Sequence, residues 1–147
     1  MTHSELAGLS VPTPQGHYRP VRRCGDILAT AGMTPRVRGE MRYPGRVGAE
    51  LSLDDARDAA RIAVRNALMA LTVEDEGLQR VRLLRMTVYV SAVDGFAEHS
   101  AVADAASDVV VRVLGERGAC ARSAIGVASL PGRACVEIEL TALVEQR

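Results

Sequence analysis

The chain contains no lysine and no tryptophan, and it has only one phenylalanine. Schiff-base catalysis by a protein side chain needs an amine, so the missing lysine excludes that chemistry. Aromatic residues make up only 3% of the chain, and 18 basic side chains, all arginine, balance 18 acidic ones. Because nucleic-acid binding depends on a positive field and aromatic stacking, this composition argues against a nucleic-acid partner.

Long apolar runs and metal-ligand clusters are also missing. Arg61 and Arg65 interrupt the most apolar helical pattern, so no membrane-spanning segment and no membrane partner are expected. The first twelve residues lack the basic and apolar regions of a signal peptide. The three histidines have no histidine or cysteine neighbours at ligand spacing, so we expect no metal site.

Cysteine is scarce. Cys24, Cys120 and Cys135 are odd in number and far apart, which is typical of free thiols in a reducing compartment. A cytoplasmic location is therefore expected. We interpret Cys135 as a small buried filler, with a reactive thiol as the alternative.

A chain of 147 residues is long enough for one domain with a substantial core. Residues 1–15 are expected to form a loose N-terminal segment, because Pro12 and Pro14 disfavour regular structure. Residues 16–147 are expected to form a single domain.

The hydrophobic periodicity predicts seven main elements. Strands are expected over residues 18–23, 27–34, 83–91, 121–127 and 134–144, with a loop or short hairpin over 35–51. A helix should begin after Ser52 and run to about Leu71, with a solvated face that includes Arg65. A second helix should begin at Asp94-Gly95 and end at Gly115. In the strand over 83–91, Leu84 is expected to share a face with Met86.

This order of elements predicts an α+β fold. Each helix links two strands as a crossover would, and right-handed crossovers place both helices on one face of a mixed sheet. The opposite face mixes polar and apolar residues, so we expect other copies of the chain to cover it.

The segment over residues 121–139, ARSAIGVASLPGRACVEIE, places charges inside strands. The even positions from 134 to 144 are all apolar, so Glu137 and Glu139 should lie on the less apolar face of the sheet. We expect Arg122 on the same face, where it could meet Glu137. A buried charge needs a partner, so Arg122 pairs either with another residue or with a substrate carboxylate. Periodicity leaves both roles open.

The same segment resembles the C-terminal signature ARS…LP…VEIE of the RidA/YjgF reactive-intermediate deaminases, formerly called L-PSP endoribonucleases. The resemblance runs from about Gly16 to Val144. It is supported by five further pieces of sequence: GHY, ILATAGMTP, NALMAL, MTVYVS and DGFAEH.

The resemblance implies a chorismate-mutase-like α+β fold, assembled as a homotrimer with clefts between subunits. It implies hydrolysis of 2-imino or enamine acids to 2-keto acids and ammonia, without metal or cofactor. Arg122 would hold the substrate carboxylate through a bidentate fork. Glu137 would position or activate water, and Tyr18 and Gly32 would line the cleft.

Two further positions are carried over although the residues differ from those common in the family. Ala124 stands where a cysteine is frequent, and Ser100 stands where an asparagine is frequent. Two alternatives to the deaminase stay open on the sequence. One is a non-catalytic trimer that binds small carboxylates or acts as a regulator, and the other is an RNase, against which the composition argues.

Overall fold

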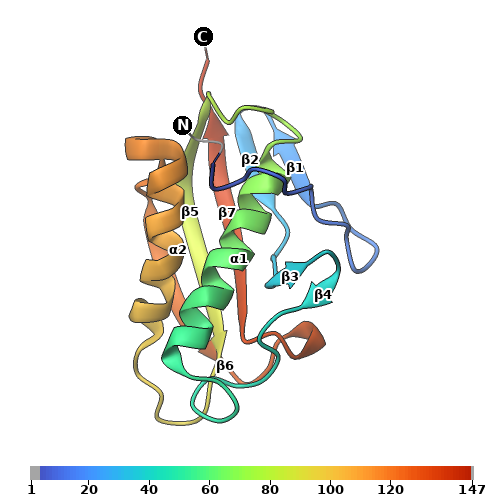
Figure 1. Cartoon of the computed structure of the whole chain (residues 1–147). Coiled ribbons are helices and arrows are strands. Elements are labelled where there is room, and N and C mark those ends of the chain that lie inside the picture. Colours follow the sequence, from blue (N-terminus) through green and yellow to red (C-terminus); the bar gives the residue numbers. More distant parts are fainter. Residues whose placement is uncertain (1–3, 147) are drawn as a thin grey trace.

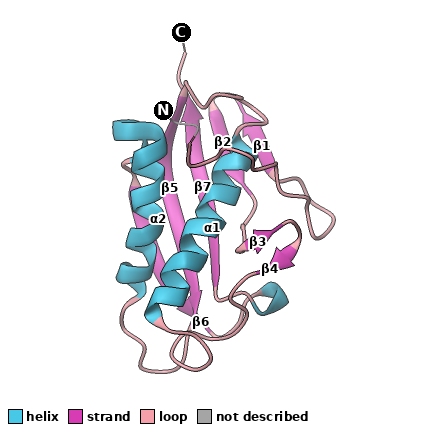
Figure 2. Ribbon diagram, viewed as in Figure 1, coloured by secondary structure: helices cyan, strands magenta, loops and turns pink. Residues whose placement is uncertain are grey.

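The computed structural model of the protein describes residues 4–146, and its centre is a five-stranded sheet with two helices on one face (Figure 1). The strands lie in the order β1-β2-β7-β5-β6. Their bounds are Val21–Cys24 for β1, Ile27–Thr30 for β2, Val81–Ser91 for β5, Ala121–Val127 for β6 and Val136–Val144 for β7. The helices are α1, Leu53–Leu71, and α2, His99–Leu114, and Figure 2 shows them side by side over the sheet.

The sheet is mixed, as predicted. β6 pairs parallel with β5, and every other neighbouring pair is antiparallel. A separate two-stranded hairpin, β3 over Arg36–Val37 and β4 over Glu40–Met41, lies in the segment predicted as a loop or short hairpin. Short 3-10 turns follow α2 at Gly115–Gly118 (η1) and precede β7 at Pro131–Arg133 (η2). The predicted α+β class is therefore confirmed.

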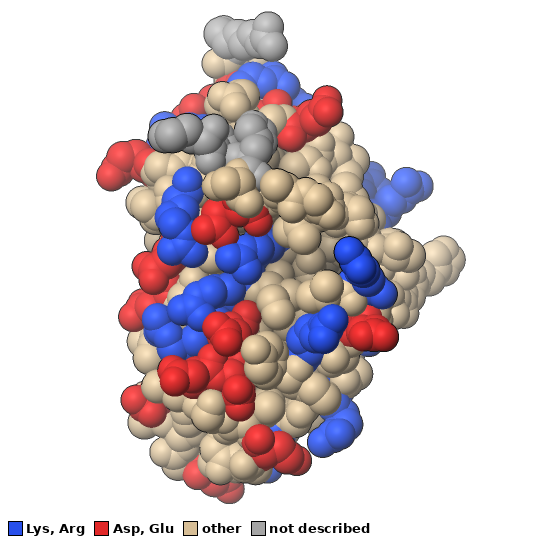
Figure 3. Space-filling view, viewed as in Figure 1, with Lys and Arg blue, Asp and Glu red and all other residues tan. Residues whose placement is uncertain are grey.

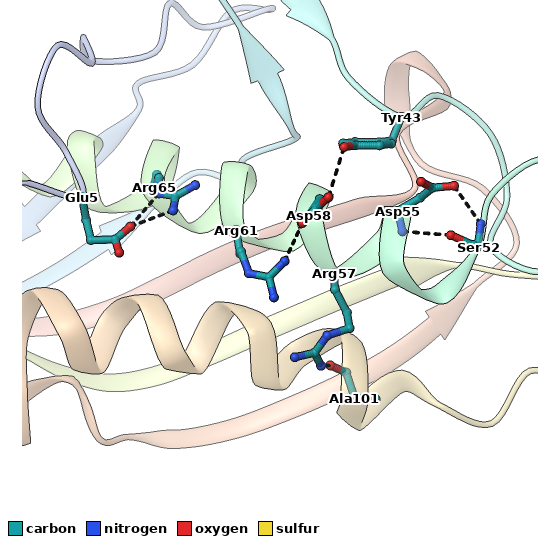
Figure 4. A network of polar contacts seen from close by, with 9 residues as sticks. All are labelled: Glu5, Tyr43, Ser52, Asp55, Arg57, Asp58, Arg61, Arg65 and Ala101. Atoms are coloured by element: carbon teal, nitrogen blue, oxygen red, sulfur yellow. Dashed lines mark hydrogen bonds and ion pairs between the residues drawn. The ribbon is translucent and has the colours of Figure 1, made fainter.

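The start of α1 follows directly from its sequence. The Ser52 hydroxyl accepts a hydrogen bond from the Asp55 amide at 3.1 Å, and the Asp55 carboxylate accepts one from the Ser52 amide at 3.0 Å (Figure 4). This capping box satisfies two of the amides that a helix leaves unpaired. The buried stripe of α1 consists mainly of alanine, which lets the helix lie close to the sheet and to α2.

The second helix begins later than predicted. It starts at His99 and not at Asp94-Gly95, because residues 92–98 form a loop in which Gly95 has a φ of 83°. The Phe96 ring packs edge-on against the His99 ring at 5.0 Å and holds this loop against the helix start. The end of the helix at Gly115 is confirmed, with a left-handed φ of 62° that favours glycine.

Strand β5 contains a bulge that corrects one prediction. Leu83 lies opposite Ala142 and Arg85 lies opposite Thr141, so β5 has one extra residue at this point. The bulge turns Leu83 inward, at 3% exposure, and leaves Leu84 51% exposed on the face away from the helices. The prediction that Leu84 and Met86 share a face was wrong, because strict alternation fails at an inserted residue.

The first two strands are shorter than predicted. β1 begins at Val21 because Pro20, which precedes it, has no N–H for the ladder. β2 ends at Thr30, yet Met33 still forms an isolated bridge with Ile138 of β7.

The N-terminal segment is irregular over residues 4–15, as predicted, but its first part is not loose. Leu6 is buried in the core. The Glu5 carboxylate accepts hydrogen bonds from Arg65 of α1 at 2.7 Å and Arg112 of α2 at 2.7 Å; Figure 4 shows the contact with Arg65. These contacts, first the one with Arg65, lower the pKa of Glu5. Arg65 is therefore more than a solvated residue of the helix face, because it binds Glu5, and Glu5 in turn links the N-terminal segment to both helices.

Candidate functional site

A pocket of about 330 Å³ opens at the beginning of β7. Five separate segments of the chain build it: the N-terminal loop, the turn after β2, β3, η2 and β7. Its lining residues are Gln15, Tyr18, Ala31, Gly32, Thr34, Arg36, Pro131 and Glu137. Three of the residues carried over from the family resemblance, Tyr18, Gly32 and Glu137, thus lie together.

An irregularity in the β2–β7 pairing places Gly32 against Glu137. Ala29 lies opposite Thr141 but Met33 lies opposite Ile138, so the β2 side has one more residue than β7 over this stretch. The Thr30 hydroxyl accepts the hydrogen bond from the Leu140 amide, which keeps that amide paired across the irregularity. Bulges of this kind are frequent beside functional sites.

Gly32 gives the Glu137 side chain the space it occupies. A β-carbon at this position would lie 2.7 Å from Oε2 of Glu137, closer than real contacts permit. The Glu137 side chain therefore extends over the backbone of Gly32, and the missing side chain makes room for the carboxyl group.

The Glu137 carboxyl has unusual electrostatics. Burial is the main cause that raises its pKa, and the negative charge of Glu139 adds to the effect. No side chain or amide of residues 4–146 donates a hydrogen bond to it, so it faces the pocket with its proton-binding oxygens available. A half-buried carboxyl with a raised pKa is suited to exchange a proton with water or a ligand.

Glu139, two residues along the same strand face, is in a different situation. The Tyr89 hydroxyl donates a hydrogen bond to its Oε1 at 2.9 Å, and this bond is the first cause of the raised pKa of Tyr89. Strand periodicity gives both glutamates the same face and cannot separate them. The structure does: Glu139 is held by a neighbour, and Glu137 lines the pocket.

Tyr18 forms the outer wall of the pocket. Its ring is 48% exposed, and its hydroxyl accepts a hydrogen bond from the Gln15 amide at 3.1 Å. The N-terminal loop thereby folds back on itself and brings Gln15 into the pocket wall.

Arg122 lies elsewhere, which corrects the prediction that it shares a face with Glu137. β6 pairs with β5 and not with β7, and the register puts Arg122 opposite Met86, whose side chain is buried beneath the helices. Nη1 of Arg122 donates to Asp104 at 2.8 Å and to Ser107 at 2.9 Å, both on α2. The prediction failed because it placed the apolar side of β6 against the helices. On this edge strand the apolar residues face away from the helices, and Ile125 is 42% exposed.

Ala124 and Ser100 do not line the pocket either. Ala124 is on the Arg122 face of β6 and packs partly buried against the core, while Ser100 is exposed in the first turn of α2. The six carried-over residues thus form two groups within one chain. Tyr18, Gly32 and Glu137 lie at the pocket, and Arg122, Ala124 and Ser100 lie on β6 and α2.

Arg36 is a pocket residue that sequence reasoning missed. Among 18 arginines, several of them in the same loop, nothing in the pattern distinguishes it.

The cysteines are outside the pocket. Cys135 is fully buried, and burial raises the pKa of its thiol to about 12, so the prediction of a buried filler is confirmed. Cys24 is exposed and Cys120 is partly buried, and neither forms a disulfide.

Residues 4–146 offer neither a metal-ligand cluster nor a helix that could span a membrane. No group of three His, Cys, Asp or Glu residues there could hold a metal ion. None of the helices in that range is both long and apolar enough to cross a membrane.

Fold and pocket together define a small α+β protein with an acidic residue at the end of a sheet, and comparisons identify its family. The family described as "YjgF/chorismate mutase-like, putative endoribonuclease" matches residues 3–142. The chain therefore belongs to the YjgF family, and its chorismate-mutase-like fold is confirmed.

Individual relatives agree with this assignment. TCP17 of Trypanosoma cruzi is 35% identical over 145 residues, which cover 94% of this chain and 88% of that protein. The crystal structure of Atu1372 from Agrobacterium tumefaciens, a protein of unknown function, is 30% identical with a TM-score of 0.90, over 99% of this chain and 94% of that one. A structure described as a "putative endoribonuclease" from Shewanella oneidensis is 28% identical with a TM-score of 0.90, over 97% and 99% of the two chains.

Proposed function

We propose that the protein is a cofactor-independent hydrolase of reactive 2-imino and enamine acids, which it converts to 2-keto acids and ammonia. The observation that carries the proposal is the Glu137 carboxyl, which faces a pocket of about 330 Å³ with a raised pKa and no hydrogen-bond donor among residues 4–146. The proposal extends the family assignment, which covers nearly the whole chain.

The reaction needs few groups. A protonated imine is already electrophilic at carbon, so the protein has to fix the substrate, exclude bulk water and aim one water molecule. Glu137 takes a proton from that water as its oxygen bonds to the imine carbon. Glu137 returns that proton to the nitrogen of the amino alcohol, and the C–N bond breaks with its electron pair leaving on ammonia. The hydroxyl proton passes to water as the carbonyl of the keto acid forms. Tyr18 covers the pocket, and Gly32 leaves space for the carboxyl.

In this proposal Arg122 holds the substrate carboxylate at the pocket of a neighbouring copy. Both contacts of Arg122 with α2 use Nη1, so Nε and Nη2 make no hydrogen bond within residues 4–146. These two groups form one side of the guanidinium fork, which fits the two oxygens of a carboxylate. Asp104 and Ser107 would hold the fork in position on the edge strand.

The function is tested by turnover. Fresh 2-iminopropionate should release pyruvate and ammonia at least about tenfold faster with micromolar protein than in buffer, where hydrolysis is spontaneous. Heat-denatured protein is the control. An unchanged rate, combined with measurable binding of pyruvate, would favour the alternative, a carboxylate-binding or regulatory protein.

A homotrimer is expected in solution. Three large apolar side chains on the sheet face away from the helices, Ile27, Leu84 and Ile125, are 42–51% exposed, and burying them against other copies would stabilise an assembly. Size exclusion coupled to light scattering should give about three times the mass of one chain. A stable monomer at micromolar concentration would contradict the assembly and the shared site.

RNase activity is the weakest candidate. On the helix side of the molecule, positive and negative side chains are intermixed rather than gathered by sign (Figure 3). With a formal net charge of zero and scarce aromatic residues, the chain lacks the features that hold RNA. A single-stranded RNA substrate, tested beside the imine, should stay intact.

A further inference from the structure

We propose that Arg36 is a second anion-binding residue of the Glu137 pocket and selects 2-imino and 2-keto acids that carry a second, distal carboxylate. The inference rests on the proposed function for the identity of the reacting group, but the binding preference can be measured without turnover.

The structure holds the backbone of Arg36 firmly at the pocket edge. The side-chain amide of Asn66, on α1, donates to the carbonyl oxygens of Thr34 at 3.0 Å and Arg36 at 2.9 Å. The Arg36 amide donates to Thr34, and the β3–β4 pairing joins Arg36 to Met41. The side chain therefore starts from a fixed point, which lowers the entropy cost of holding a ligand.

The guanidinium is also restrained. Nη1 of Arg36 donates to the Gly39 carbonyl at 2.9 Å. Nη2 lies so close to Gly132 of η2 that a β-carbon there would be 2.9 Å away. Gly132 has a φ of 64°, so glycine both relieves the backbone and makes room for the guanidinium.

No carboxylate of residues 4–146 lies within 4.0 Å of the Arg36 guanidinium, although nine ion pairs form in that range. Glu137 lines the same pocket, and its pKa is raised by burial and by Glu139 with no lowering by the Arg36 charge. Positive and negative groups thus occupy the pocket without pairing, and a ligand fits between them. A guanidinium has five N–H donors, and within residues 4–146 only one of those of Arg36 is used.

The two arginines then have separate tasks. Arg122 of a neighbouring copy holds the carboxylate next to the imine carbon, and Arg36 binds the one at the far end of the ligand. An acid with a carboxylate at each end suits this arrangement. A ligand with an apolar tail offers no carboxylate to Arg36 and should therefore bind less tightly.

The test compares two stable keto acids of equal chain length, 2-oxoglutarate and 2-oxopentanoate, by isothermal titration calorimetry. The parent protein should bind 2-oxoglutarate about tenfold or more tightly than 2-oxopentanoate, as one charge-assisted pair implies. Arg36→Gln should lower the affinity for 2-oxoglutarate to that for 2-oxopentanoate, and Arg36→Lys should fall between the two.

Arg42→Gln is the matched control, because it removes the same charge from an exposed residue that follows the hairpin and does not line the pocket. It should keep the parental preference. Equal binding of the two acids by the parent would overturn the inference, as would an equal loss for both acids in Arg36→Gln, which would assign Arg36 to the carboxylate beside the imine. If the protein hydrolyses imines but shows no preference for 2-oxoglutarate, the role of Arg36 is refuted and the proposed function stands. If it shows the preference but does not hydrolyse imines, the proposed function is refuted and the role of Arg36 in binding stands.

Discussion

Replacing Glu137 with glutamine is expected to lower imine turnover by about a hundredfold or more while the fold and keto-acid binding are kept. Glutamine has nearly the same size and fits over Gly32, but it cannot take a proton from water. The change also removes a charge that burial disfavours, so the variant should unfold at the same temperature as the parent or higher near neutral pH. Keto-acid release and thermal unfolding, measured on the same preparation, check both parts.

Glu139→Gln is the matched control for this variant. It makes the same chemical change two residues away on the same strand face, where the Tyr89 hydroxyl already occupies the carboxylate. Turnover should fall less than about fivefold, the scale expected for one weakened hydrogen bond outside the pocket. If Glu139→Gln is inactive and Glu137→Gln is active, the assignment of the water-activating residue is wrong.

The pH dependence of turnover offers an independent check on Glu137. Its pKa in the folded protein lies above the ordinary 4.5, because burial and Glu139 disfavour the charged form. Since the ionised carboxylate accepts the proton from water, the acid limb of the rate profile should lie above pH 4.5 and be absent from the residual activity of Glu137→Gln.

Replacing Arg122 with alanine is expected to reduce turnover about as strongly, with Arg122→Lys retaining more activity than Arg122→Ala. Lysine keeps the charge but loses the planar two-point grip on a carboxylate. The loss should show as weaker substrate binding together with a lower maximal rate, because a misaligned carboxylate also misplaces the imine carbon.

A control is needed for the contacts of Arg122 with α2, because a purely structural Arg122 would make the same contacts. Asp104→Asn removes the charge of the partner, whose side chain is 60% exposed, and leaves the guanidinium in place. A surface pair of this kind contributes at most about 1 kcal/mol to stability. If Arg122 serves the substrate, Asp104→Asn should keep at least about a tenth of the turnover.

Equal turnover in Arg122→Ala and the parent would mean that Arg122 is a structural ion pair only. A lower melting temperature in Arg122→Ala would not distinguish the two roles, because either can stabilise the fold. Turnover and substrate affinity are therefore the readouts that decide.

Much of the architecture follows from local sequence. Ser52 and Asp55 cap α1, Gly115 ends α2, and the alternation from 136 to 144 sets which face of β7 is buried. These signals depend on hydrogen bonds and solvent exposure within a few residues, so they can be recognised without knowing the tertiary structure. The class of sheet and the placement of both helices on one face follow from the order of such elements.

The family resemblance also points to Glu137, Gly32 and Tyr18, which the structure brings together at one pocket. Their spacing along the chain gives no reason for them to meet. Only the bulge between Ala29 and Met33 explains why the backbone of Gly32 lies under the Glu137 carboxyl.

Tertiary structure alone decides which group each charged side chain of the site contacts. Alternation gives the two sides of a strand but not which side meets the helices or which strand lies next to it, so Arg122 was assigned to the wrong face. The same limit hid the difference between Glu137 and Glu139, which depends on Tyr89 of another strand, and the place of Arg36 in the pocket. Sequence determined which residues could carry charge at the site, and the packing of distant segments decided which of those charges are paired and which face the pocket.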